Sequence, residues 1–153
     1  MLALLLAAAT LSTPLKLGVW RVERITDPMT DEVTTAAVVK TEDAFLQISC
    51  GSKTPGTMSV ILTDRTYFGA LGPKVYREGA YRIGTGSPVS VRWGYYRNVA
   101  ILGESDAPGF VSALKGASKI TLQLSNYEDF QIVRQIPTTG MDQAMTETVQ
   151  ACF

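Results

Sequence analysis

One stretch organises this chain, and it is the end: Thr138-Thr139-Gly140-Met141-Asp142-Gln143-Ala144-Met145-Thr146-Glu147-Thr148-Val149-Gln150-Ala151-Cys152-Phe153. Mostly apolar residues recur in it with the spacing of one helix face, and these are Met141, Met145, Thr148, Val149 and Cys152. The spacing predicts a short terminal helix, which would be marginal in water by itself. Its apolar stripe ends on Cys152, and the only other cysteine in the chain is Cys50.

Bulk composition limits the kinds of partner. A chain of 153 residues is expected to form a single domain with a sizeable core. It carries 14 Lys and Arg against 14 Asp and Glu, so no net field gathers phosphates, and we expect no nucleic acid partner.

The N-terminus predicts export. Residues Met1 to Thr10 form an apolar run that is too short to span a bilayer, and it contains the small residues Ala7-Ala8-Ala9. We interpret residues 1–9 as a signal peptide cleaved near Ala9, and residues 15–153 as one exported domain, periplasmic or secreted, with no membrane span after cleavage. The run lacks a Lys or Arg at its start, so an uncleaved anchor or an upstream start codon stays open as an alternative.

Export makes the two cysteines a candidate disulfide, because the compartment is oxidising and the cysteine count is even. In the segment around Cys50, alternation places Leu46, Ile48 and Cys50 on one strand face, which should point inward. Helical spacing independently turns Cys152 toward the core. We therefore predict a Cys50–Cys152 disulfide, with two separate buried thiols as the alternative.

Strand-like segments fill most of the remaining chain. They are bounded by Gly, Pro, Asn and Asp, and they cover residues 18–26, 33–40, 44–50, 58–62, 75–83, 89–95, 99–102, 118–126 and a last strand before Pro137. Residues 18–63 read as a meander of four antiparallel strands. The clearest inward faces carry Ile120, Leu122 and Leu124 in one segment and Val89, Val91, Trp93 and Tyr95 in another.

The predicted fold is mainly β. Phe110, Val111 and Leu114, followed by Gly116, indicate one or two turns of internal helix. The pattern predicts an antiparallel β-sandwich or partly open barrel of eight or nine short strands, with this helix and a C-terminal helix. An α+β sheet with both helices on one face is the alternative.

Residues suited to catalysis are scarce. The chain has no histidine, which is the usual base of hydrolytic triads, and two distant cysteines cannot complete a zinc site. We expect no enzyme activity, no metal and no cofactor. The residues that leave a hydrolase open as a remote alternative are two Ser–Lys pairs and four carboxylate pairs in turns, namely Ser52-Lys53, Ser112 with Lys115, Asp27 with Asp31, Glu42-Asp43, Glu104 with Asp106, and Glu128-Asp129.

One segment mixes arginines with aromatics, as surfaces that stack sugars or bases do. If Trp93 and Tyr95 point inward, the outer side chains form a candidate binding surface of Arg82, Arg92, Tyr96 and Arg97. The nearby Gly84-Thr85-Gly86-Ser87 lacks the Lys-Ser/Thr of a phosphate loop and is better explained as a hairpin turn. The Met141 and Met145 stripe could serve a partner, but burial explains it better.

The order of these features resembles the VasI/TagO-type accessory proteins of bacterial type VI secretion. The resemblance rests on Gly18-Val19-Trp20-Arg21-Val22, Asp27-Pro28-Met29-Thr30-Asp31, Leu46-Gln47-Ile48-Ser49-Cys50, Tyr81-Arg82-Ile83-Gly84, Trp93, Phe110-Val111-Ser112-Ala113-Leu114-Lys115-Gly116-Ala117 and the Gly140-x-x-x-Ala144 helix that ends at Cys152. After Met29 the chain reads Thr30-Asp31-Glu32-Val33 instead of the family's Asp-Asp-Ser-Lys. The resemblance implies a non-enzymatic periplasmic accessory protein.

The expected function is therefore binding or assembly in the cell envelope, through a protein surface and with another envelope or secretion-apparatus protein as the partner. A carbohydrate- or envelope-binding module that uses Arg92 and Tyr96 is the second hypothesis. A carboxylate-dependent hydrolase is the third, and it would need two carboxylates in one cleft, roughly 5 to 10 Å apart.

Overall fold

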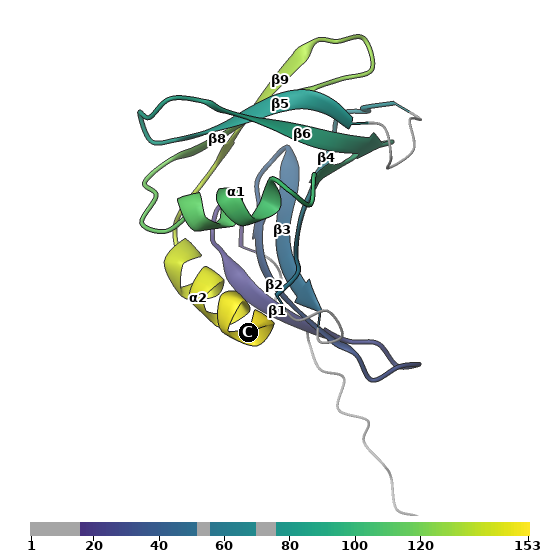
Figure 1. The fold of residues 1–153 in the computed structure, drawn as a ribbon, viewed down its shortest axis with the longest axis vertical. Helices are drawn as coiled ribbons and strands as arrows, with labels where there is room; N and C mark the ends of the chain where they lie inside the picture. The colour runs from purple at the N-terminus through teal and green to yellow at the C-terminus, as the bar shows by residue number, and fades with distance from the viewer. Residues whose placement is uncertain (1–15, 52–55, 70–75) are drawn as a thin grey trace, which may run out of the picture.

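The computed structural model describes residues 16–51, 56–69 and 76–153. The predicted signal peptide, residues 1–9, lies outside the described residues. One curled antiparallel sheet forms most of the described chain (Figure 1). Its nine strands are β1 (Arg21–Thr26), β2 (Val33–Lys40), β3 (Ala44–Gly51), β4 (Met58–Asp64), β5 (Tyr76–Ile83), β6 (Val89–Tyr96), β7 (Val99–Leu102), β8 (Ile120–Ser125) and β9 (Gln131–Ile136).

The strand order is β1-β2-β3-β4-β7-β6-β5-β8-β9, and every neighbouring pair is antiparallel. The predicted four-stranded meander is confirmed in β1 to β4. The sheet curls into a half-barrel, in which β5, β6 and β8 cross steeply over β2 to β4 (Figure 1). This is the partly open barrel that the strand pattern predicted.

The two edges of the sheet meet at one end. Val19, just before β1, forms a parallel bridge with Thr139, just after β9. The backbone N–H of Trp20 donates to the carbonyl of Thr139 at 2.9 Å, and the indole N–H of Trp20 donates to the carbonyl of Pro137 at 2.6 Å. The buried tryptophan therefore joins the start of the sheet to its end and partly closes the barrel.

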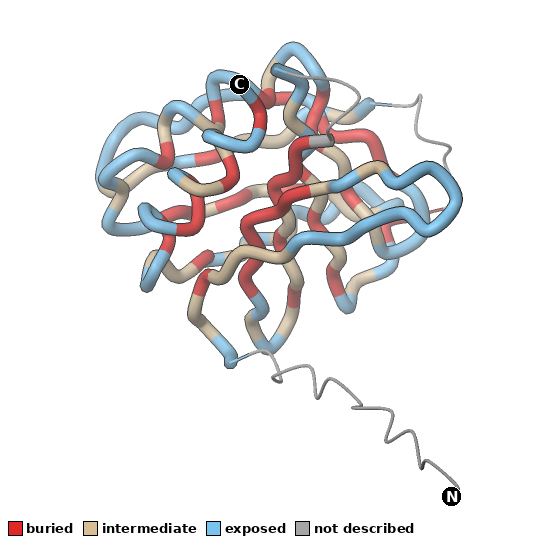
Figure 2. Tube along the Cα trace, turned by 90° about the horizontal axis from the view of Figure 1, so that it is seen from below, coloured by how far each residue is buried: buried red, intermediate tan, exposed pale blue. Residues whose placement is uncertain are grey.

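Alternating apolar side chains explain which face each strand buries. Ile120, Leu122 and Leu124 are all fully buried, and so are Leu46 and Ile48, which confirms both predicted faces. Buried residues gather in the middle of the strands, and exposed residues lie at the turns (Figure 2).

One residue on the predicted inner face of β6 is exposed instead of buried. Val91, Trp93 and Tyr95 are buried, but Val89 is 45% exposed. Val89 opens β6 directly after the exposed hairpin turn and pairs with Tyr81. It has the correct parity for the inner face but lies at the end of the strand, where the core no longer covers it.

Close packing inside the curl leaves no room for a side chain at Gly79. A Cβ built there would lie 2.5 Å from the carbonyl oxygen of Gln123 and 2.7 Å from the indole of Trp93. A real Cβ does not approach the backbone that closely, so the glycine allows β5 to lie close to β8 with the indole of Trp93 packed over Gly79.

The two helices pack on the inner side of the sheet. Helix α1 (Ala107–Ala113) begins three residues before the predicted Phe110, since Pro108 is accepted in its first turn. Helix α2 (Met141–Cys152) follows Gly140, whose φ of 75° favours glycine. The predicted α2 stripe is buried apart from half-buried Val149, so its main role is packing against β1 to β3.

The predicted disulfide is confirmed. Cys50 of β3 and Cys152 at the end of α2 are bonded, with their Cα atoms 5.4 Å apart and a sequence separation of 102 residues. Both cysteines are buried. Disulfides of this kind persist in oxidising compartments, and within the described part of the chain no helix is long and apolar enough to cross a membrane.

A second link crosses the barrel interior. Arg134 of β9 donates two hydrogen bonds to the carboxylate of Asp64 of β4, at 2.6 Å and 2.8 Å. Asp64 is fully buried in its side chain, which would raise the pKa of its carboxyl group, but hydrogen bonds from Arg134 and from Thr66 outweigh burial and hold that pKa below its ordinary 3.8. The ion pair connects two strands that are not neighbours in the sheet.

Candidate binding groove

The four residues of the predicted binding surface lie along the outer side of β5 and β6. Arg82 donates to the carbonyls of Gly86 at 2.8 Å and Thr85 at 3.2 Å, so its guanidinium is bound to its own hairpin turn. At the other end of β6, the guanidinium of Arg97 lies 5.4 Å from the ring centre of Tyr96. Arg82 is therefore separated from Tyr96 and Arg97 by the length of the strand.

Arg92 lies in the middle of β6, about 13 Å along the strand from Tyr96. It lines a small hollow of about 340 Å³ together with Tyr76, Glu104 and Asp106. Asp106 accepts the backbone N–H of Arg92 at 2.8 Å. Glu104, Asp106 and Arg92 give this hollow mixed charge, and the aromatic side chain that lines it is Tyr76 and not the predicted Tyr96.

The predicted carboxylate pairs occupy separate turns. Asp27 accepts the backbone N–H of Met29 at 2.7 Å and so shapes its own turn. Asp43, in the turn between β2 and β3, forms an ion pair at 2.9 Å with Arg65, which follows β4. Within the described ranges, no group of three or more Asp, Glu, His or Cys side chains is placed to hold a metal ion. Asp27 and Asp43 thus have local structural roles.

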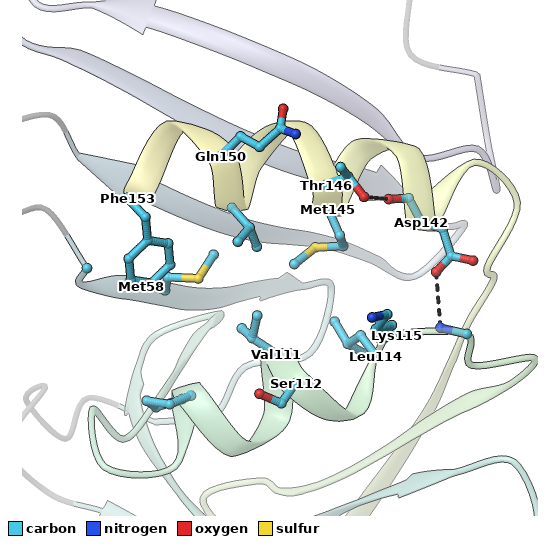
Figure 3. A pocket seen from close by; sticks show the side chains of 14 residues that line it. Met58, Val111, Ser112, Leu114, Lys115, Asp142, Met145, Thr146, Gln150 and Phe153 are labelled. Carbon is cyan, nitrogen blue, oxygen red and sulfur yellow. Dashed lines mark hydrogen bonds between the residues drawn. The ribbon is translucent and has the colours of Figure 1, made fainter.

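A groove lies between α1 and α2, and Met58 of β4 also lines it (Figure 3). Its volume is about 820 Å³, within the range of ligand sites in proteins. We call it the α1–α2 groove, and it is lined by Gly56, Met58, Pro108, Val111, Ser112, Leu114, Lys115, Gly116, Asp142, Met145, Thr146, Val149, Gln150 and Phe153. Helical spacing explains why each helix contributes one row of these side chains.

The α1–α2 groove has an apolar end and a polar end. Met58 and Phe153 lie together at one end, and Lys115 and Asp142 lie at the other (Figure 3). Phe153 is 84% exposed, although it is a large apolar side chain beside an apolar hollow. An exposed apolar surface of this kind, bordered by polar groups, is typical of interaction sites.

Covalent and hydrogen bonds fix the walls of the α1–α2 groove. The disulfide holds the last turn of α2 to β3, and the backbone N–H of Gly56 donates to the carbonyl of Cys152 at 2.8 Å. At the polar end, the backbone N–H of Gly116 donates to the carboxylate of Asp142 at 3.2 Å. Both ends of α2 are therefore tied, which pre-forms the groove before anything binds.

The predicted Ser–Lys pair falls in the α1–α2 groove, since Ser112 and Lys115 both line it. Ser52-Lys53, the other pair, lies outside the described residues. The α2 stripe was predicted to be buried packing, but Val149 at its edge is only half-buried and also lines the groove. No sequence signal marks the groove, because Val111 of α1 becomes half-buried and faces it only through the packing of α1 beside α2.

No protein-family model matches this chain, and neither a curated protein nor a solved structure is significantly similar to it.

Proposed function

We propose that this protein is a non-enzymatic binding protein of the cell envelope that holds an apolar segment of a partner protein in the α1–α2 groove. The observation that supports it best is the pre-formed groove itself, whose wall α2 is secured by the Cys50–Cys152 disulfide. The disulfide also favours an oxidising location such as the periplasm.

The shape of the groove favours a protein segment. It is an open trough between two helices, and its apolar lining includes Met58 and Met145, whose flexible side chains adapt to different partners. Two helices and a strand offer a surface of the kind in which amphipathic peptides bind. A partner that covered Phe153 and Val149 would remove apolar surface from water, which drives association.

Crosslinking in cells tests this function. A photoreactive amino acid replaces Gln150, which is exposed on the rim of the groove, and the matched control carries it at Gln135, which is exposed on the outer face of β9. The expected result is one adduct, identified by mass spectrometry as an exported protein, that forms from position 150 and disappears when Val149→Asp is added. Equal adducts from both positions, or none from position 150, would reject the groove as the binding site.

Association with type VI secretion is a narrower form of this proposal and rests on the resemblance to VasI/TagO-type proteins. Its test is the genomic neighbourhood together with the identity of the crosslinked partner. Secretion-apparatus genes beside this one, and a secretion-apparatus protein in the adduct, support the association. A prophage setting with an unrelated partner would remove it and leave the groove proposal unchanged.

A further inference from the structure

We infer that the segment bound in the α1–α2 groove is an amphipathic helix that carries an acidic residue at the end lying against Lys115. The inference rests on the proposed function, because it takes the groove to be the binding site. It adds the conformation, the charge and the direction of the bound segment.

The dimensions of the groove match a short helix. Helix α1 has seven residues and helix α2 has twelve, so at a rise of about 1.5 Å per residue the two walls are about 10 Å and 18 Å long. Apolar side chains at positions i, i+4 and i+7 of a helix span about 10 Å. Two turns of a bound helix therefore place three side chains along the groove.

The apolar contacts available to such a helix lie toward one end. Val111 of α1 and Val149 of α2 face the groove from opposite walls, and both are only half-buried. Met58 and Phe153 continue the apolar surface beyond them (Figure 3). These four side chains would bury more of their apolar surface if a third helix packed between α1 and α2 at ordinary interhelical distances of about 8–10 Å.

Lys115 is the cation at the polar end of the groove. Lys115 is exposed, and among the described residues its ammonium group makes no ion pair or hydrogen bond. Asp142, by contrast, already accepts the backbone N–H of Gly116 and lies in the first turn of α2, where a helix favours negative charge. An acidic side chain on the occupant would complement Lys115 and fix which end of the bound helix lies there.

A phage-displayed library of 14-residue amphipathic helical peptides tests the inference. The library is selected on the oxidised full chain, and clones are kept only if Val149→Asp abolishes their binding. We expect these clones to share a Glu or Asp at one end of their apolar stripe. Replacing that acid by Gln should weaken binding to the wild-type chain about two- to fivefold, as exposed ion pairs do, and should change nothing in a Lys115→Gln variant.

Each other outcome is decisive. Groove-dependent clones with no acidic preference, or an acid whose effect persists in Lys115→Gln, would overturn the inference and leave the proposed function standing. A selection that yields no groove-dependent clone would overturn both the inference and the proposed function, and binding of dodecanoate in that case would identify a fatty acid as the ligand. Circular dichroism checks that each variant folds, and Thr146→Arg on the exposed rim serves as the groove variant if Val149→Asp does not fold.

Discussion

Removal of the disulfide should lower the stability of the whole chain. The bond closes a loop of about a hundred residues, from a sequence separation of 102, and the chain-entropy relation gives about 4 to 5 kcal/mol for a loop of that size. For a protein of this length, 1 kcal/mol shifts the melting temperature by about 2–4 °C. A loss of about 4 kcal/mol therefore lowers the melting temperature by about 8–16 °C.

The test compares urea unfolding of the oxidised chain with that of a Cys50→Ala/Cys152→Ala variant. Alanine leaves no buried hydroxyl group, so the comparison isolates the crosslink more cleanly than serine does. Hydrogen exchange should also show that the last turn of α2 loses protection before β8, because that turn depends on the bond. An unchanged unfolding midpoint, or equal loss of protection in α2 and β8, would refute the view that the bond secures the helix.

Three further changes test the packing and the interior ion pair. Gly79→Ala should destabilise the chain by about 1–3 kcal/mol, because the new Cβ would lie 2.5 Å from a backbone oxygen. Gly109→Ala in α1 should instead stabilise the chain by about 0.5–1 kcal/mol, because a Cβ there has no neighbouring atom within 4 Å. Thermal unfolding that gives both variants the same change in stability would contradict this. Asp64→Asn should cost about 3 kcal/mol at neutral pH, because it leaves Arg134 without its buried partner. The pKa of Asp64 is lowered in the folded state, so the stability that its charge contributes is complete above the ordinary pKa of 3.8 and is lost as the pH falls below that value. The difference in unfolding free energy between wild type and Asp64→Asn, measured by urea unfolding, should therefore be smaller at about pH 2 than at neutral pH. A difference that stays constant with pH would show that the carboxylate charge is not responsible.

Local patterns were sufficient for the strands and for the disulfide. The alternation of Ile120, Leu122 and Leu124 carries its own face assignment, because a strand has a period of two. Cys50 and Cys152 could be paired because two different periodicities each turned a cysteine inward. The alternation did not predict that Val89 is exposed, because it gives the face of a residue but not whether the core covers that end of the strand.

The groove and the ion pair could not be predicted in this way. Val111 and Val149 are far apart in sequence and belong to different helices, so only the packing of α1 beside α2 brings them to one groove. Asp64 and Arg134 meet across the barrel because the sheet curls. Each is a charged residue at an inward position of its strand, but alternation within one strand does not reveal which distant residue it pairs with. Arg92 and Tyr96 share an outer face as expected, but they lie too far apart along the strand to line the same hollow.

The decisive measurement is the affinity, for three forms of the chain, of peptides selected on the oxidised wild-type chain alone, before Val149→Asp is used to discard any clone. Fluorescence polarisation compares wild type with Val149→Asp in the groove and with the matched Val133→Asp, an exposed valine on the outer face of β9. We predict that Val149→Asp weakens binding at least about tenfold, equivalent to about 1.4 kcal/mol, while Val133→Asp leaves the affinity unchanged. Equal affinities for all three forms, or a loss only with Val133→Asp, would contradict it.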